Sequence, residues 1–289
     1  MRHRARCLLV VGVAGAALAC GGGEDQGRSA LERLRAAGVV AIGYANEAPY
    51  AFQDTATGRM TGEAPEIARV VFERMGIPEI EGVLTEFGSL IPGLHAGRFD
   101  MIAAGMYITP ERCAQAAFSE PTYAVGEGFI VAAGNPLDLH SYEDVRNEPA
   151  ATLGVVAGAI ERIYAREVGI PDERIVTFPD ALAALAGVRA SRVSAYAATA
   201  LTVRDLLGKE AAGVEQALPF ADPVIDGETV QGYGAFAFRR EDQALLAEFN
   251  RHLESFSGTP EHLDLVAPFG FTARELPGDV TTAQLCREE

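Results

Sequence analysis

The sequence has little positive charge. It contains 24 Lys and Arg residues against 40 Asp and Glu residues, which gives a formal net charge of −16. Proteins that bind nucleic acid need basic side chains to neutralise phosphates. This balance argues strongly against nucleic acid as a partner, and we expect none.

Motifs for cofactors, metals and catalysis are also missing. The sequence has no Cys-x-x-Cys, His-Glu-x-x-His, Gly-x-Ser-x-Gly or Gly-x-x-x-x-Gly-Lys pattern. We interpret the scattered His95, His140, His252 and His262 as surface or core residues rather than ligands. An acid and a base could lie among forty carboxylates, but no pair is singled out. We therefore expect no enzyme activity, no metal and no cofactor.

The start of the chain has the pattern of an export signal. Arg2, Arg4 and Arg6 precede an apolar run that is too short to span a bilayer. We expect residues 1–19 to be removed as a signal peptide. Cys20 and the three glycines after it resemble a lipoprotein processing site, so we expect Cys20 to carry lipid, with simple release as the alternative.

Cysteine is scarce, with 4 residues in the chain. If Cys7 leaves with the signal and Cys20 carries lipid, Cys113 and Cys286 remain in an oxidising compartment. We expect a disulfide between them, which would tie the C-terminal tail to the helix that carries Arg112. Two unrelated thiols are the alternative.

Strands and helices alternate along the chain, which indicates an α/β fold with a mostly parallel sheet. With 289 residues, 48% of them hydrophobic, the chain can bury a sizeable core in one large domain or two smaller ones. The expected strands are Val39–Tyr44, Val83–Glu86, Phe99–Ala104, Thr152–Val156 and Ile175–Phe178. Expected helices begin at Glu63, Ser89, Ser141, Ala159 and Asp180.

A weak internal repeat suggests two similar lobes, because residues 96–105 align with residues 190–199. Two apolar segments, Gly128–Ala132 and Tyr233–Phe238, could join the lobes. The last third of the chain, with helices near Gln243–Ser255 and Thr259–Val266, would then complete the first lobe. The expected divisions are a tether and start of the first lobe at 20–37, the first lobe at 38–129, the second lobe at 130–231, and completion of the first lobe with a tail at 232–289.

One strand-to-helix corner looks suited to binding an anion. Thr109 can cap the helix that Pro110 begins, and such a helix start presents free backbone N–H groups. Arg112 lies in the first turn, where the helix dipole favours acids. Its position suggests a guanidinium held for a carboxylate, although an ordinary surface Arg is the alternative.

Other groups follow the predicted strands of the first lobe. Glu47 and Tyr50 follow the first strand, Phe87 follows the second, and Tyr107 and Arg112 follow the third. In open parallel sheets ligands bind outside the carboxyl ends of the strands, so these five side chains could converge. Three aromatic faces, one anion and one guanidinium fit a small zwitterion.

At this point the chain resembles a known family. Gly97–Asp100, Ile108–Arg112 and Gly258–Leu263, together with the export signal and the two-lobed pattern, are similar to the family 3 solute-binding proteins of ABC importers. The resemblance covers nearly the whole mature chain. It implies a type II periplasmic-binding-protein fold, in which two α/β lobes joined by a two-strand hinge enclose a ligand cleft. It also implies a partner permease in the cytoplasmic membrane and a cargo that is usually a polar amino acid.

Finer motifs resemble the ectoine- and hydroxyectoine-binding branch of that family. They are Asn46–Tyr50, Gly62–Glu66, Phe87–Leu94 and Pro110–Cys113. The resemblance implies an aromatic cage of Tyr50, Phe87 and Tyr107 around the solute ring. It places Glu47 against the ring nitrogens and Arg112 against the carboxylate.

The second lobe departs from the amino-acid binders. They place an Asp after the second-lobe strand to pair with the α-ammonium, whereas this chain has Ser194 within the motif and Thr199 at that place. Second-lobe helices in the family often begin with Gly-Thr, whereas here the run is Gly158 to Glu161. We expect Gly105, Gly158, Ile160 and Thr199 to complete the ligand site.

These observations predict an exported, lipid-anchored and monomeric receptor, in the periplasm or on the outer face of the cytoplasmic membrane. It would bind ectoine or hydroxyectoine and deliver the solute to an ABC permease. A binding protein for a polar amino acid or a betaine is the nearest alternative. A dehydratase of small carboxylates and a sensor domain are alternatives of other classes.

Overall fold

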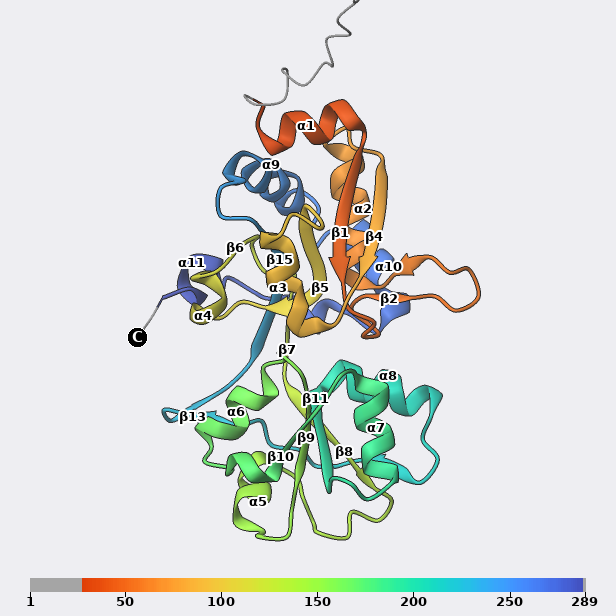
Figure 1. Ribbon diagram of the computed structural model, residues 1–289, viewed down its shortest axis with the longest axis vertical. Coiled ribbons are helices and arrows are strands. Elements are labelled where there is room, and N and C mark those ends of the chain that lie inside the picture. The colour runs from red at the N-terminus through yellow and green to blue at the C-terminus, as the bar shows by residue number, and fades with distance from the viewer. Residues whose placement is uncertain (1–27, 288–289) are drawn as a thin grey trace, which may run out of the picture.

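In the computed structural model, which describes residues 28–287, the chain forms two α/β lobes, each with its own main sheet (Figure 1). The expected signal peptide, Cys20 and most of the tether lie outside the described residues. Within residues 28–287, no helix has the length and apolar character needed to cross a membrane. The type II two-lobed architecture expected from the sequence is confirmed.

Lobe 1 is built on a sheet with the order β4-β1-β5-β15-β6, in which β7 also pairs with β15. Its strands are β1 (Val39–Tyr44), β4 (Glu79–Leu84), β5 (Met101–Tyr107), β6 (Ala117–Phe118), β7 (Tyr123–Val125) and β15 (Gly232–Phe238). Strand β1 runs parallel to β4 and β5, and β15 runs antiparallel to β5. The parallel strands therefore end at one edge of the sheet, where the ligand-site residues follow them.

Helices cover this sheet and complete the lobe. They are α1 (Ala30–Ala37), α2 (Glu63–Arg74), α3 (Leu90–His95), α4 (Pro110–Cys113), α9 (Gln243–Glu254), α10 (Pro260–Val266) and α11 (Thr282–Leu285), with short 3-10 turns at Phe87–Ser89, Ala267–Phe269 and Ala273–Glu275. A small ladder of β2 (Phe52–Gln53) and β3 (Met60–Thr61) lies at one side. Helix α2 buries Ile67, Val71 and Phe72 completely, which accounts for the apolar periodicity of that segment.

Lobe 2 has a sheet with the order β10-β9-β11-β8-β12. Its elements are β8 (Glu127–Ala132), α5 (Tyr142–Asn147), β9 (Leu153–Val156), α6 (Glu161–Glu167), a 3-10 turn (Asp172–Arg174), β10 (Ile175–Phe178), α7 (Ala181–Arg189), β11 (Ala195–Thr199), α8 (Ala200–Lys209), β12 (Val214–Gln216), β13 (Val224–Ile225) and β14 (Glu228–Thr229). Ser141, Asp180 and Thr199 cap α5, α7 and α8 by accepting backbone N–H groups.

The chain passes between the lobes twice. Strand β7 ends at Val125 in the sheet of lobe 1, and β8 begins at Glu127 in the sheet of lobe 2. The expected boundary after residue 129, and the idea that Gly128–Ala132 joins the lobes, are therefore wrong. An apolar run looks the same whether its partner is β15 or β11, so local pattern does not locate the crossing. The return crossing precedes Gly232.

Two expected strands of lobe 1 are displaced in the structure. Strand β4 covers Glu79–Leu84 rather than 83–86, because it is an edge strand with several exposed positions and has no continuous apolar run. Strand β5 continues through Gly105, which has φ of +64°, to Tyr107. The sequence pattern predicts an end before this glycine, but the strand accommodates it where its pairing with β15 shifts register.

A disulfide joins Cys113 at the end of α4 to Cys286 after α11. The tail is held further by Thr282, whose hydroxyl donates to the carbonyl of Ser119 at 2.6 Å. The cross-link spans 173 residues. In a chain-entropy description, so long a loop stabilises the fold by about 5 kcal/mol.

Glu63, the first residue of α2, is a buried carboxyl inside lobe 1. It is 1% exposed, and Oε1 accepts a hydrogen bond from the Thr122 hydroxyl at 2.9 Å. The other oxygen has no hydrogen-bond partner. Burial raises the pKa of Glu63 to about 8, because the charged form loses its hydration.

The raised pKa of Glu63 predicts a pH-dependent stability. Between about pH 5 and about pH 8 the folded chain holds a proton at Glu63 that the unfolded chain releases, so the free energy of unfolding falls as pH rises. We expect Glu63→Gln to reduce this slope by up to about 1.4 kcal/mol per pH unit. Urea denaturation across this range measures the slope. Glu73→Gln, which changes an exposed acid of the same helix, is the control, and equal slopes in both variants would contradict the assignment.

Candidate ligand-binding site

A small cavity lies between the two lobes. Lobe 1 supplies Glu47, Tyr50, Phe87, Gly105, Tyr107 and Arg112, and lobe 2 supplies Ala159, Ile160, Glu161 and Thr199. The structure therefore brings together eight of the nine residues that the sequence suggested for the ligand site. Gly158 does not line the cavity, but it lies directly beside it.

The lobe 1 residues reach the cavity because they follow the ends of strands. Glu47 and Tyr50 lie in the loop after β1, which is held by paired backbone hydrogen bonds between Glu47 and Ala51 of 2.9 and 3.0 Å. Phe87 begins a 3-10 turn after β4, and Tyr107 ends β5. This is the edge at which ligands bind in open parallel sheets.

Gly105 makes room for the ring of Tyr50. A Cβ atom at Gly105 would lie 2.6 Å from atoms of that ring, and the backbone there has φ of +64°. Tyr50 is 2% exposed and also packs against Tyr123, with ring centroids 5.1 Å apart. The ring is therefore fixed in place before any solute arrives.

Arg112 is a buried cation with two backbone partners. It is 9% exposed, and its guanidinium donates to the carbonyl of Tyr107 at 2.8 Å and to the carbonyl of Gly158 at 3.0 Å. Its Cζ atom lies 5.6 Å from the centroid of the Phe87 ring. Burial lowers the pKa of Arg112, but a guanidinium keeps its charge in proteins. Because Arg112 forms no ion pair with a described carboxylate, the cation is available to an anionic ligand group.

The lobes are closed on one another around this cavity. The Tyr50 hydroxyl donates to Thr199 Oγ1 at 2.8 Å, and the Thr202 hydroxyl donates to Glu47 Oε1 at 3.1 Å. Backbones also meet, since a Cβ atom at Gly158 would lie 2.5 Å from the Cα atom of Gly88. Side chains larger than hydrogen at this contact would hold the lobes apart.

Glu161 is a cavity residue that the sequence did not single out. Gly158 and Ile160 of the same run are expected at the ligand, whereas Glu161, which begins α6, also faces the cavity from lobe 2. It is 4% exposed, and Oε2 has no hydrogen-bond partner. Acids are common in the first turn of helices, so the pattern gave no functional signal.

A second buried carboxyl, Glu127, lies on the strand next to Thr199. The two residues are partners in the β8–β11 ladder. Glu127 Oε2 accepts a hydrogen bond from the Tyr142 hydroxyl at 3.1 Å, whereas Oε1 has no partner. Burial, followed by the charge of Glu161, raises the pKa of Glu127 well above its usual value.

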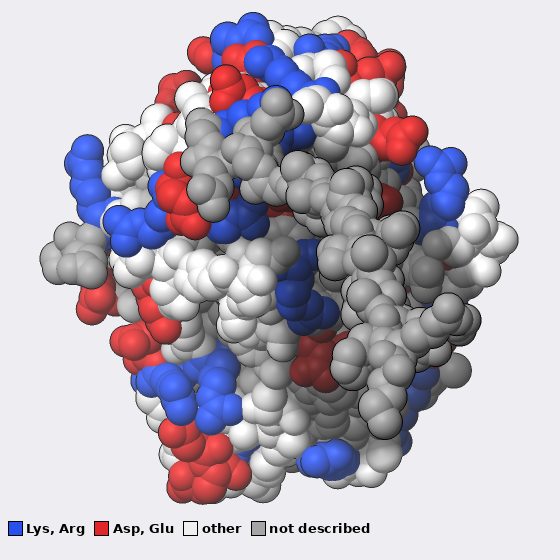
Figure 2. Space-filling model, turned by 45° about the horizontal axis from the view of Figure 1, so that its top comes forward, with Lys and Arg blue, Asp and Glu red and all other residues white. Residues whose placement is uncertain are grey.

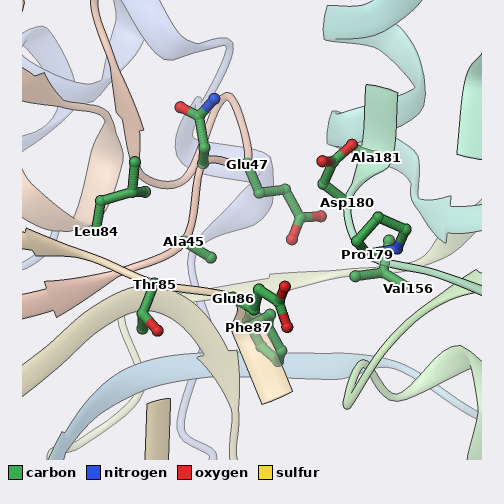
Figure 3. Close-up of a pocket in the computed structure, with 11 residues that line it drawn as sticks. Ala45, Glu47, Leu84, Thr85, Glu86, Phe87, Val156, Pro179, Asp180 and Ala181 are labelled. Atoms are coloured by element: carbon green, nitrogen blue, oxygen red, sulfur yellow. The ribbon is translucent and has the colours of Figure 1, made fainter. Parts of the chain in front are cut away.

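A wider pocket of about 400 Å³ adjoins the cavity and shares Glu47 and Phe87 with it. Figure 3 shows the carboxylates of Glu47 and Glu86 facing the space of this pocket, while Asp180 lies at its edge and accepts the backbone N–H of Ala183. Glu86 and Asp180 are exposed. The cavity thus has acidic surroundings on this side and a guanidinium within.

The described residues were also searched for a metal site and for a functional histidine. Within residues 28–287 there is no group of three or more His, Cys, Asp or Glu side chains that could hold a metal ion. His262 is buried and accepts a hydrogen bond from the backbone N–H of Gly258, which is a structural contact. Acidic and basic side chains are interspersed on the face that Figure 2 displays.

Comparisons with known proteins agree with this architecture. The model for bacterial extracellular solute-binding proteins, family 3, matches residues 40–269. The chain is 42% identical over 264 residues to the probable amino-acid ABC transporter periplasmic-binding protein y4tE of Sinorhizobium fredii, covering 90% of this chain and 87% of that protein. It is 26% identical over 211 residues to the lysine/arginine/ornithine-binding periplasmic protein of Escherichia coli, covering 71% of this chain and 77% of that protein.

Solved structures of solute-binding proteins are also similar to this chain. The crystal structure of EhuB in complex with hydroxyectoine is 33% identical, with a TM-score of 0.81, and the match covers 91% of this chain and 100% of that one. An ancestral amino acid-binding protein described as a precursor of cyclohexadienyl dehydratase is 25% identical, with a TM-score of 0.72 and coverage of 83% and 99%. The family consists of exported proteins that bind small solutes for ABC importers. By the length of these matches, and by its two lobes closed over a cavity, the chain belongs to the bacterial extracellular solute-binding proteins, family 3.

Proposed function

We propose that this solute-binding protein binds ectoine or hydroxyectoine and delivers it to an ABC permease. The observation that carries the proposal is the enclosure of Arg112, Glu47 and three aromatic side chains around one small cavity. A guanidinium fits the solute carboxylate, and an acid with aromatic faces fits a flat, delocalised cation. Ectoine combines both groups in one compact ring.

The size of the cavity supports a compact solute. The cavity is small, and three aromatic rings and Ile160 line most of it, with few polar groups, as is typical of small-molecule sites. Thr199 supports the proposal as well, because its hydroxyl is engaged by Tyr50 and supplies no charge for an α-ammonium. The similarity to EhuB, whose crystal structure holds hydroxyectoine, points in the same direction.

A cationic amino acid is the second candidate, and Glu161 is the observation that favours it. Thr199 stands where amino-acid binders have an Asp, but Glu161 brings an acid from lobe 2 to the cavity. An ionised Glu161 could pair with an α-ammonium while Arg112 held the carboxylate. The E. coli relative is named for binding lysine, arginine and ornithine.

We also propose the remaining features that the sequence indicated. The receptor acts as a monomer, its mature chain is anchored through lipid on Cys20, and it has no cofactor. A dehydratase would require a general acid, and Glu161 is the residue that could supply one. Recovery of ectoine unchanged after long incubation with the protein, checked by proton NMR, would support a binding role. A new product would contradict it.

The first test is calorimetry of the purified protein with ectoine, hydroxyectoine and L-arginine. We expect tight binding of ectoine or hydroxyectoine and weaker or no binding of L-arginine. Tight binding of L-arginine with no heat from either ectoine would overturn the proposal. A betaine serves as a third comparison, because it offers a cation and a carboxylate without a flat ring.

The aromatic cage can be tested by Phe87→Ala. Loss of one ring over a desolvated cation costs about 0.5–2 kcal/mol, so we expect the ectoine affinity to fall by about 2- to 30-fold. Phe269→Ala is the matched control, because Phe269 is a half-buried ring that does not line the cavity. Equal effects of the two substitutions would argue against the cage.

Gly105→Ala tests whether the position of Tyr50 sets the affinity. The added methyl would collide with the Tyr50 ring and disturb its hydrogen bond to Thr199, so we expect ectoine affinity to fall by about tenfold or more. Gly97→Ala has nearly the same backbone strain, with φ of +68°, but no atom within 4 Å of the new methyl. If both variants bind ectoine equally well, Tyr50 does not act in this way.

A further inference from the structure

Carboxyl groups outnumber cations in the closed cleft. Glu47 and Glu161 line the cavity from opposite lobes, and Glu127 lies close behind the wall formed by lobe 2. Arg112 is the single Lys or Arg among the residues that line the cavity. When all of these groups are ionised, the negative charge of the site therefore exceeds its positive charge.

Few of the groups around Glu161 stabilise a negative charge on its side chain. Its electrostatic neighbours are Glu47 in the loop after β1, Arg112 on α4, Glu127 on β8, Tyr142 on α5, Tyr164 on α6 and Tyr196 on β11. Tyr142 donates its hydroxyl to Glu127 rather than to Glu161. The guanidinium of Arg112 donates to the carbonyls of Tyr107 and Gly158. One oxygen of Glu161 therefore remains buried without any partner.

A zwitterionic solute does not remove this imbalance, since its charges cancel one another. Its carboxylate would face Arg112 and its ring cation would face Glu47, which leaves the charge of Glu161 without an opposite charge. A buried carboxylate in that position neutralises by taking up a proton. In its neutral form it has an O–H group to donate, and the solute is the missing acceptor.

We propose that Glu161 receives the solute as a neutral carboxylic acid, whose O–H donates to the solute carboxylate beside Arg112, so that ectoine binding takes up a proton. This inference deepens the proposed function and rests on it. It makes Glu161 a specificity residue that favours a net-neutral solute with an exposed carboxylate oxygen. Affinity then falls as pH rises, because the competent form of Glu161 becomes rarer.

The electrostatics of the closed cleft support this assignment. Burial first, and the nearby carboxylate of Glu47 second, raise the pKa of Glu161 to about 8, against the opposing influences of a hydrogen bond from its own backbone N–H and of Arg112. Between the usual pKa of Glu and this value, the closed state binds a proton that a solvated carboxyl releases. The complex should therefore take up protons near neutral pH, and the neutral acid should be its main form there.

Calorimetry with ectoine from about pH 6 to about pH 9 tests the inference. For the native protein we expect the affinity to fall by up to about tenfold per pH unit as pH rises. In addition, the binding heat should depend on the ionisation enthalpy of the buffer. Glu161→Gln keeps a neutral donor and cannot titrate, so at pH 7 it should bind ectoine more tightly than the native protein, which must first take up a proton, and it should lose most of the pH dependence. Glu167→Gln, an exposed acid on the same helix, should behave as the native protein does.

Two outcomes would overturn the inference directly. One is an ectoine affinity that is independent of pH in the native protein. The other is loss of ectoine binding in Glu161→Gln combined with an affinity that rises with pH in the native protein, which would mean that an ionised Glu161 holds the cation. If neither ectoine nor hydroxyectoine binds at any pH while L-arginine does, the proposed function fails first and the inference falls with it.

An infrared measurement keeps the inference testable if Glu161→Gln does not fold. Ectoine-bound native protein carrying labelled Glu side chains should show the carbonyl stretch of a protonated buried carboxyl. Glu63→Gln and Glu127→Gln, measured in the same way, identify the bands of the other buried acids. A spectrum in which every such band is removed by those two substitutions would overturn the inference.

Discussion

The structure depends most on how one buried guanidinium is held. Arg112 donates to the carbonyl of Tyr107 in its own lobe and to the carbonyl of Gly158 in the other lobe. It thereby joins the two lobes while keeping its charge unpaired by protein carboxylates. Removing a cation from water is costly, so the protein must supply hydrogen-bond acceptors that replace its hydration. The carbonyl partners do this without neutralising the charge, which leaves the cation to attract a solute anion.

Small residues allow the closed arrangement around this cation. Gly88 and Gly158 let two backbones meet across the cleft, and Gly105 lets the ring of Tyr50 lie against β5. Gly232, the first residue of the returning strand β15, lies under the ring of Tyr107, so any side chain there would overlap that ring. The wall of the site is thus packed directly on the strand that brings the chain back into lobe 1. The position of Tyr107 is therefore set by contact with the segment that returns from lobe 2.

The sequence predicts those parts of the site that follow from local rules. Thr109 caps α4 as expected, with its hydroxyl accepting the N–H of Arg112, and the strand-end rule brings Glu47 and Arg112 to one cavity. What the sequence does not predict depends on tertiary context. Strand β4 lies at a sheet edge and so lacks an apolar run, while the crossing at residue 126 involves a change of partner strand. Glu161 carries no local signal, because an acid at a helix start is ordinary and only the closed cleft buries it.

The distribution of charge also favours one orientation of the solute in the site. Exposed Glu86 and Asp180 border the outer pocket, whereas Arg112 lies inside against Phe87. Exposed acids act over about 8–10 Å at physiological salt, so they repel free anions and attract cations at the entrance. A simple anion that approaches through this region is repelled by the acids, and a simple cation that enters meets a guanidinium. A zwitterion is the class of solute that both regions can accommodate, with its cationic end toward Glu47 and its carboxylate toward Arg112. The same polarity explains why a further acid on the inner wall, Glu161, is compatible with the solute carboxylate once it carries a proton.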